Sequence, residues 1–120
     1  MTRSAINPVA HLELQTTDAA RARAFLTDSF GWRAETVPVG PRSYLALELG
    51  DRIAGGIVER DVERPLWLPY VEVDDITEAT RRAHRLGASV VLPPREGLVG
   101  WRSVLLAPAG GEIALWQPKR

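Results

Sequence analysis

His11 is the residue near the start of the chain whose type and position could do chemistry. It lies in VAHLELQTTD, residues 9–18, and shares one side of an alternating segment with Glu13 and Gln15. Three roles are open to such an imidazole: metal ligand, general base, or an ordinary side chain on a half-solvated sheet face. If His11 acts as a base, Glu13 is the carboxylate that would orient its ring, so these two residues are the catalytic candidates.

Local patterns predict the elements that must position this histidine. Residues 9–16 are expected to form a strand with one buried side, because leucines alternate with the polar set. A helix follows, with Thr17 or Asp18 as its N-cap and Gly31 as its end. Turn sequences then separate three further strands, expected at 33–39, 43–49 and 52–59.

The same order of elements is predicted a second time. LWLPYVEV, residues 66–73, is a strand candidate, and the helix after it has Asp75 and Glu78 at capping-box spacing and ends at Gly87. The remaining strands of this half are expected at 88–92, 102–106 and 112–116.

Counting back from the two helix-ending glycines aligns the halves. His11 lies twenty residues before Gly31, and Leu68 lies nineteen residues before Gly87. The strand that carries His11 therefore corresponds to the strand that carries Leu68, and the chain is predicted to contain one structural unit twice.

The fold class expected is α+β, with two tandem βαβββ modules that form a curved mixed sheet cup and carry their helices on its outer face. We expect a single domain over residues 1–120, with module 1 at about 7–60 and module 2 at about 65–118. ERDVERP, residues 59–65, is the predicted linker, because it is charged, short and ended by proline. The alternative is an α+β sandwich without internal symmetry.

Composition excludes several classes of function. The 120 residues include 15 basic and 15 acidic side chains, so no net charge favours nucleic acid or a membrane surface. Without cysteine there can be no disulfide framework and no thiolate catalysis. The N-terminal residues lack the apolar region of a signal peptide, and no apolar run is long enough to span a bilayer. We expect a cytoplasmic protein that binds neither nucleic acid nor membrane.

Several stretches gain meaning from their order and spacing. They are HLEL before TTD, RARAFL leading into FGW at 30–32, VEVDD at 71–75, LGA at 86–88, PPREGLVGW at 93–101 and PAGGEIALWQP at 108–118. Together they resemble the vicinal oxygen chelate superfamily, the glyoxalase, bleomycin resistance and extradiol dioxygenase group, and within it the compact glyoxalase-like branch. The similarity covers nearly the whole chain, although Leu26 and Ala107 depart from the family's usual tyrosine and aspartate.

This resemblance implies where a divalent ion would bind in metal-dependent relatives. They use four positions, one on the first and one on the last strand of each module, and only His11 matches with a donor. The other three positions hold residues without donor side chains: Leu68, Ala114 and one of Ala54, Gly55, Gly56 or Ile57. A divalent first-row ion generally needs about three protein donors. We therefore predict no metal site and no cofactor.

Strand alternation predicts what the cup would contain instead. Tyr70 and Trp116 supply aromatic walls, Trp67 and Trp101 are rim candidates, and a small-molecule site needs such apolar surface with sparse polar groups. Glu13 and Glu72 would favour a cationic or hydrogen-bond-donating ligand. The full set of predicted ligand-binding residues is His11, Glu13, Gln15, Trp67, Leu68, Tyr70, Glu72, Trp101, Ala114 and Trp116.

These observations favour a metal-independent binding protein, a homodimer whose cups hold a small aromatic or amphipathic molecule in the manner of the bleomycin resistance members it resembles. The dimer is implied by the family. One alternative is a lyase or isomerase that acts on a small carbonyl compound with His11 as general base. Others are a divalent-metal-dependent glyoxalase-type enzyme and a purely structural or protein-binding module.

Overall fold

The computed structural model describes residues 6–120, which form ten helices and strands arranged in two compact units. Unit 2 comprises Ala10–Leu68, and unit 1 comprises Pro69–Arg120 together with the described residues 6–9. No helix in the part of the chain that the structure describes is long and apolar enough to cross a membrane.

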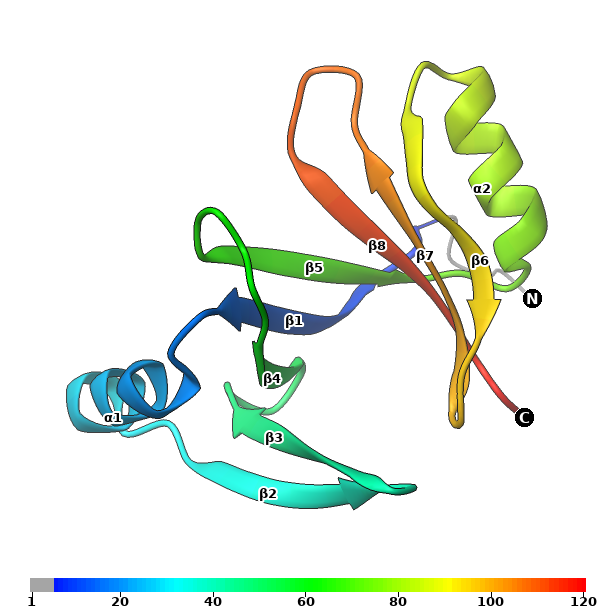
Figure 1. Ribbon diagram of the computed structural model, residues 1–120. Coiled ribbons are helices and arrows are strands. Elements are labelled where there is room, and N and C mark those ends of the chain that lie inside the picture. Colours follow the sequence, from blue (N-terminus) through cyan, green and yellow to red (C-terminus); the bar gives the residue numbers. More distant parts are fainter. Residues whose placement is uncertain (1–5) are drawn as a thin grey trace. The chain divides into compact units, whose positions relative to one another are not determined.

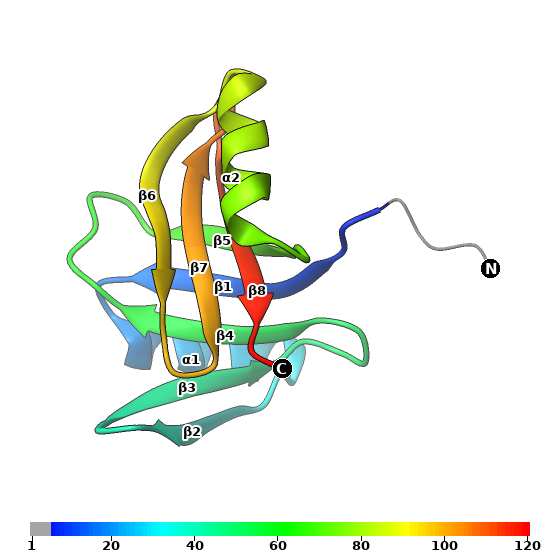
Figure 2. The ribbon, with the colours of Figure 1, turned by 90° about the vertical axis from the view of Figure 1, so that its right-hand side faces the viewer.

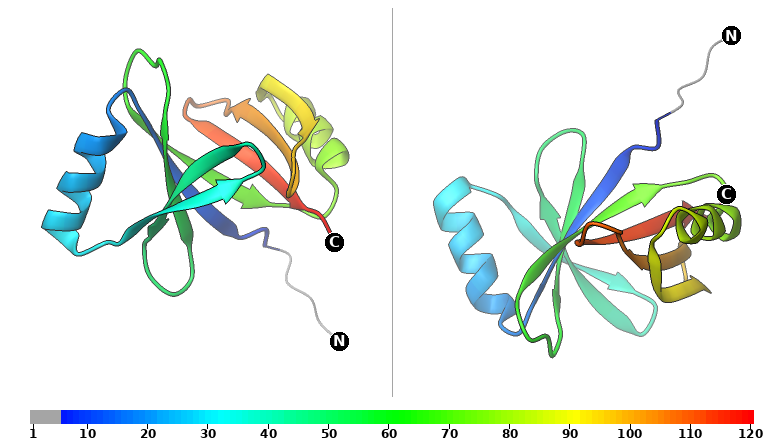
Figure 3. Two further views of the ribbon diagram at one scale, coloured as in Figure 1. Left: turned by 60° about the horizontal axis from the view of Figure 1, so that its bottom comes forward. Right: turned by 90° about the horizontal axis from the view of Figure 1, so that it is seen from above.

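Unit 2 contains four strands and one helix in βαβββ order (Figure 1). Their bounds are β1 Val9–Thr16, whose first residue belongs to unit 1, α1 Ala19–Phe30, β2 Ala34–Val39, β3 Arg42–Glu48 and β4 Ala54–Glu59. In space the strands run β2-β3-β4-β1, and β1 pairs with β4 in parallel while the other two pairs are antiparallel. The helix lies beside this group of strands (Figure 3).

Unit 1 repeats this plan. Its bounds are β5 Leu66–Glu72, whose first three residues belong to unit 2, α2 Ile76–Arg85, β6 Ser89–Glu96, β7 Gly100–Leu106 and β8 Glu112–Pro118. The strands run β5-β8-β7-β6, with β5 and β8 parallel and the rest antiparallel. This order repeats that of unit 2 when each strand is replaced by its counterpart. The predicted α+β class and the repeated βαβββ plan are therefore confirmed.

Both helices begin and end as their sequences predict. The Asp18 carboxylate accepts a hydrogen bond from the Arg21 amide at 3.0 Å, and Asp75 does the same for Glu78 at 3.1 Å. Gly31 follows α1 with φ of 71°, a left-handed conformation that a side chain would strain. An aspartate N-cap thus fixes the start of the helix in each unit.

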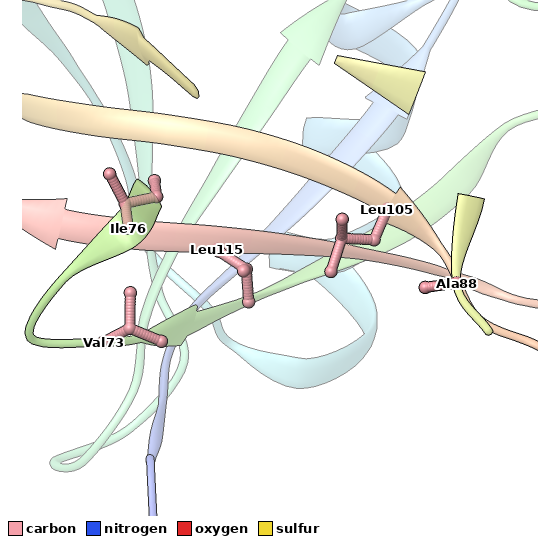
Figure 4. Packing of buried hydrophobic residues seen from close by; sticks show 5 residues of the cluster. All are labelled: Val73, Ile76, Ala88, Leu105 and Leu115. Carbon is pink, nitrogen blue, oxygen red and sulfur yellow. The ribbon is translucent and has the colours of Figure 1, made fainter. Parts of the chain in front are cut away.

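Each unit has its own apolar core between its helix and one face of its strands. In unit 2, Leu14, Leu26, Leu47 and Ile57 form the buried cluster. In unit 1 the cluster is Val73, Ile76, Ala88, Leu105 and Leu115 (Figure 4). Side chains alternate along a strand, so the residues between these core positions lie on the face away from the helix. The candidate residues His11, Glu13 and Gln15 of β1 and Leu68, Tyr70 and Glu72 of β5 lie on that second face.

A polar contact accompanies the core of unit 1. Helix α2 lies alongside β6, β7 and β8 (Figure 2). Within this layer the Thr80 hydroxyl lies 2.6 Å from the Ile76 carbonyl oxygen, to which it donates, and 2.9 Å from the hydroxyl of Ser103 on β7. Both side chains are buried, and Ser103 has no exposed surface. Because a buried hydroxyl without a partner is costly, this contact favours one placement of α2 on its strands.

Strand β6 is longer than the sequence predicted. It continues past residue 92 through Pro93 and Pro94 to Glu96, and β7 begins two residues before the predicted position. Proline cannot donate to a strand ladder, but β6 is an edge strand and its register shifts on both sides of Leu92. The prolines are therefore accommodated where the sequence indicated a turn.

Candidate functional site

The second face of unit 2 brings His11 and Tyr44 together. The Tyr44 hydroxyl lies 2.6 Å from Nε2 of His11, and the two ring centroids are 6.0 Å apart. Tyr44 on β3 and His11 on β1 are both half-buried. At this separation the phenol and the imidazole share a short hydrogen bond, in which either group can donate according to the imidazole tautomer.

Gly56 on β4 makes this bond possible. Strand β4 lies between β1 and β3, and Gly56 pairs in register with Glu13 on one side and Ala46 on the other. A Cβ atom at Gly56 would overlap the hydroxyl and ring of Tyr44. The phenol therefore crosses β4 over Gly56, which has no side chain, and so reaches the histidine two strands away.

The local environment lowers the pKa of His11. Burial is the larger cause, because it disfavours the charged imidazolium, while the nearby Glu13 carboxylate acts in the opposite direction and raises the pKa. Because the pKa of His11 lies below the ordinary value for histidine, the neutral imidazole predominates at pH 7. A neutral imidazole in a hydrogen bond with a phenol can accept a proton from a third group.

Glu13 and Gln15 form a second pair on the same strand. The Gln15 amide nitrogen donates to the Glu13 carboxylate at 3.0 Å, and both side chains are buried. Sequence reasoning placed all three β1 residues on one face and named Glu13 as the group that orients His11. The hydrogen-bond partner that the structure shows for His11 is Tyr44, which sequence reasoning missed. The alternation of β3 and the glycines of β4 were the signals that could have indicated it.

The corresponding face of unit 1 carries an arginine and a tyrosine. Nη1 of Arg102 on β7 donates to the hydroxyl of Tyr70 on β5 at 3.0 Å. Strand β8 lies between them, and its Ala114 pairs in register with Tyr70 and with Val104. Tyr70 and Ala114 are buried and Arg102 is half-buried. The predicted residues Tyr70 and Ala114 thus lie together, and Arg102 is a further residue that the sequence had not indicated.

Trp116 and Glu72 complete this face. They pair in register across β5 and β8, and Trp116 also pairs with Arg102 across β8 and β7. A Cβ atom at Gly100 would lie only 2.6 Å from the Trp116 ring, so the indole lies over this glycine. Trp116 and Glu72 are both half-buried. The face therefore combines indole surface, a phenol, a guanidinium and a carboxylate.

The remaining predicted residues lie in other surroundings. Trp101 is on the helix face of β7, where it packs against the core of unit 1 and the Lys119 ammonium lies 5.6 Å from the centre of its ring. Trp67 is 39% exposed and stands edge-on to Trp32 at 6.5 Å in unit 2. Leu68 is buried. These positions separate Trp101 from Arg102, its neighbour on the other face of the strand.

The donor set does not fit a bound divalent ion. Among residues 6–120 no group of three or more His, Cys, Asp or Glu side chains is placed to hold a metal. In register, the β4 residues opposite His11 and Glu13 are Ala54 and Gly56, which have no donor side chain. Nε2 of His11 already bonds to Tyr44. One imidazole and one carboxylate from the same strand fall short of the usual ligand count.

Relatives in sequence point to one family. Residues 9–114 match the family described as the Glyoxalase/Bleomycin resistance protein/Dioxygenase superfamily. The chain is 30% identical over 117 residues to proteins named "Putative glyoxylase CFP32" from Mycobacterium bovis and Mycobacterium tuberculosis. The match covers 91% of this chain but 45% of those relatives, so the chain spans about half of their length.

Solved structures share the fold at low sequence identity. A hypothetical protein from Bacillus halodurans C-125 matches with a TM-score of 0.72 and 14% identity, covering 95% of this chain and 96% of that one. Methylmalonyl-CoA epimerase from Mycobacterium tuberculosis matches with a TM-score of 0.66 and 17% identity, covering 100% and 93%. A Streptomyces coelicolor methylmalonyl-CoA epimerase variant in complex with 2-nitronate-propionyl-CoA has a TM-score of 0.67 and 13% identity, covering 97% and 100%.

Proposed function

We propose that this chain, which belongs to the glyoxalase/bleomycin resistance protein/dioxygenase superfamily, binds a small molecule at the face of unit 2 that carries His11 and Tyr44, without a metal ion. The observation that carries the proposal is the 2.6 Å bond across Gly56. It engages the imidazole nitrogen with a phenol and presents both rings on one face, where a planar ligand could stack and hydrogen-bond.

Metal independence can be tested at His11 directly. We expect titration with Zn²⁺, Ni²⁺ or Mn²⁺ to change the imidazole NMR signals of His11 no more than those of His84, which is exposed on α2. His11→Gln and His84→Gln serve as matched variants. Stoichiometric metal binding that disappears in His11→Gln and persists in His84→Gln would contradict the proposal.

Ligand binding can be tested by its effect on stability. A small molecule that binds only the folded chain raises the melting temperature by mass action, so a metabolite library should contain compounds that stabilise the wild type. For a compound bound at this face, Tyr44→Phe should reduce the shift, because one hydrogen-bonding group is lost. If no compound in a broad library changes the melting temperature, the proposal fails.

A second function is favoured by one specific observation. The pKa of His11 is lowered by burial, and its Nε2 lies at hydrogen-bond distance from a hydroxyl. In the tautomer whose Nε2–H donates to Tyr44, the Nδ1 lone pair can accept a proton from a carbon next to a carbonyl group. This is the first step of a lyase or isomerase that acts on a small carbonyl compound. The Tyr44 oxygen would then accept a bond from the imidazolium.

Proton exchange separates this enzyme from a binding protein. Carbonyl compounds incubated with the protein in D₂O should exchange their α-protons, as followed by NMR, if His11 removes them. We expect His11→Gln to slow such exchange about a hundredfold or more. His84→Gln should leave the exchange rate unchanged. Equal rates in the wild type and His11→Gln would exclude His11 as the base.

We also propose that the chain forms a homodimer in the cytoplasm. The outermost strands of the two units, β2 and β6, support dimerisation, because an exposed strand edge can pair with another chain. Val90 and Val91 on β6 are also exposed. Native mass spectrometry of freshly purified protein should detect twice the 13.2 kDa chain mass, and a monomer at micromolar concentration would contradict the dimer.

A further inference from the structure

We infer that the face of unit 1 formed by Arg102, Tyr70 and Trp116 binds a small-molecule carboxylate with a planar apolar body. This inference goes beyond the proposal for His11, because it concerns a different unit and names a ligand class. The first observation is the state of Arg102. The residue is half-buried and its guanidinium has five N–H donors, yet the hydrogen bond seen for it among the described residues is the single one to Tyr70 at 3.0 Å.

The guanidinium also forms no ion pair with the described residues. No carboxylate within residues 6–120 lies within 4.0 Å of Arg102 or of Arg95, which is its direct cross-strand neighbour on β6. Like charges directly opposite each other destabilise a strand pair. A bound anion would relieve this repulsion and use the remaining donors of Arg102.

The carboxylates near this pair are directed elsewhere. Glu96 follows Arg95 on β6 and therefore lies on the opposite face, where it pairs with Lys119 at 2.8 Å. Glu72 shares the face with Arg102, but Trp116 lies between them in register. The two arginines thus form a local positive site that the protein's own acidic groups leave without an ion pair.

The geometry favours a carboxylate with a planar body. A guanidinium fork matches a carboxylate in two parallel hydrogen bonds, and the bond from Arg102 to Tyr70 limits the freedom of the side chain. The Trp116 indole is held over Gly100 and offers a flat apolar surface near this fork. Val104 of β7, two residues beyond Arg102, adds aliphatic surface on the same face. An aromatic carboxylate would use both the charge and the indole surface.

Benzoate and benzamide form a matched pair of probes, since they share shape and differ in charge. We expect benzoate to bind the full chain about tenfold or more tightly than benzamide, because a charge-assisted bidentate pair replaces neutral hydrogen bonds. The dissociation constants can be measured by NMR titration. In Arg102→Gln this preference should fall to about one, and in Arg102→Lys it should be intermediate. Arg82→Gln, a substitution at an exposed arginine of α2, is the control and should keep the full preference.

The preference is the ratio of the dissociation constants of benzamide and benzoate. This ratio does not depend on whether the function proposed for His11 is correct. His11→Gln should retain the benzoate preference even if the function proposed for unit 2 is wrong. The inference is overturned if wild-type protein binds both probes equally, if it fails to bind benzoate, or if folded Arg102→Gln keeps the preference. Inorganic phosphate that displaces benzoate with equal affinity would also overturn the assignment to a carboxylate with a planar body.

Discussion

The two units use the same strand plan for different side-chain chemistry. In unit 2 the third strand in spatial order from β1 supplies Tyr44, which crosses Gly56 to reach His11. In unit 1 the equivalent strand supplies Arg102, which reaches across β8 to Tyr70, the cross-strand partner of Ala114. Both bonds therefore span a central strand. The scaffold determines the distance to be spanned, and the residue types determine the chemistry.

The strand register of each unit shows which residues of unit 2 correspond to which residues of unit 1. Gly56 pairs with Glu13 and Ala46, whereas Ala114 pairs with Tyr70 and Val104. Glu13 thus corresponds to Tyr70. The duplicated frame places a buried carboxylate in one unit where the other has a buried phenol. A sequence repeat of this kind predicts which positions face each other, but it leaves open which chemical group occupies each one.

The largest expected effect comes from the two separate cores. Leu47 of unit 2 and Leu105 of unit 1 are 2% and 5% exposed. Truncation to alanine should lower the free energy of unfolding by about 2–5 kcal/mol in each case, because it removes buried contacts and leaves a cavity. Urea unfolding measures these losses. If one substitution costs less than about 1 kcal/mol, the two cores do not contribute comparably to stability.

A smaller effect is expected at Gly56 and at Ala114, its counterpart in unit 1. Gly56→Ala should destabilise the chain by about 1–3 kcal/mol and break the bond between Tyr44 and His11, because the new methyl group overlaps the phenol. The matched change Ala114→Gly should cost about 0.5–1 kcal/mol and leave the bond between Arg102 and Tyr70 in place. Unfolding curves and the His11 NMR signals test both. Equal effects would mean that Gly56 has no special role.

The helix caps should give equal and modest effects. Asp18→Ala and Asp75→Ala each remove an N-cap hydrogen bond of about 3 Å. Each substitution is expected to cost about 1 kcal/mol of unfolding free energy. Asn at either position should restore most of the loss, since its amide oxygen also accepts the backbone bond. A large difference between the two variants would show that one helix begins by other means.

The smallest expected effect is a dependence of the free energy of unfolding on pH, caused by His11 of unit 2. Because the pKa of His11 is lower in the folded chain than in the unfolded chain, the unfolded chain binds more protons between those two pKa values. Stability should therefore fall as the pH drops below about 6.5, the ordinary histidine value. His11→Gln should reduce this fall. An NMR titration that finds the pKa of His11 raised would reverse the prediction.

Local sequence signals predicted most of the fold. The aspartate caps, the helix-ending Gly31 and the strand at residues 9–16 each depend on residues within one element, and the structure confirms them. The single buried side expected of this strand was wrong, because Glu13 and Gln15 are buried along with Leu14. Strand β6 was predicted too short, because Pro93 and Pro94 are typical of turns and only the sheet order shows that β6 is an edge.

The sequence predicted the candidate site less completely than the fold. His11 and Tyr70 were identified from alternation within their own strands, whereas Tyr44 and Arg102 act across two strands. Their contacts depend on the register of three strands at once, and no local pattern specifies this register. Gly56 is informative only when the strand beside it is known.

The hydroxyl contact between Thr80 and Ser103 has a consequence for how α2 could evolve. A leucine at position 80 would bury more hydrocarbon, yet it would allow the helix to roll or slide along a smooth apolar layer. The hydroxyl pair contributes less apolar burial than a leucine would, but it favours one defined position of α2 on its strands. Substituting both residues together by apolar ones should yield a protein that resists urea as well as before but shows broadened NMR lines along α2.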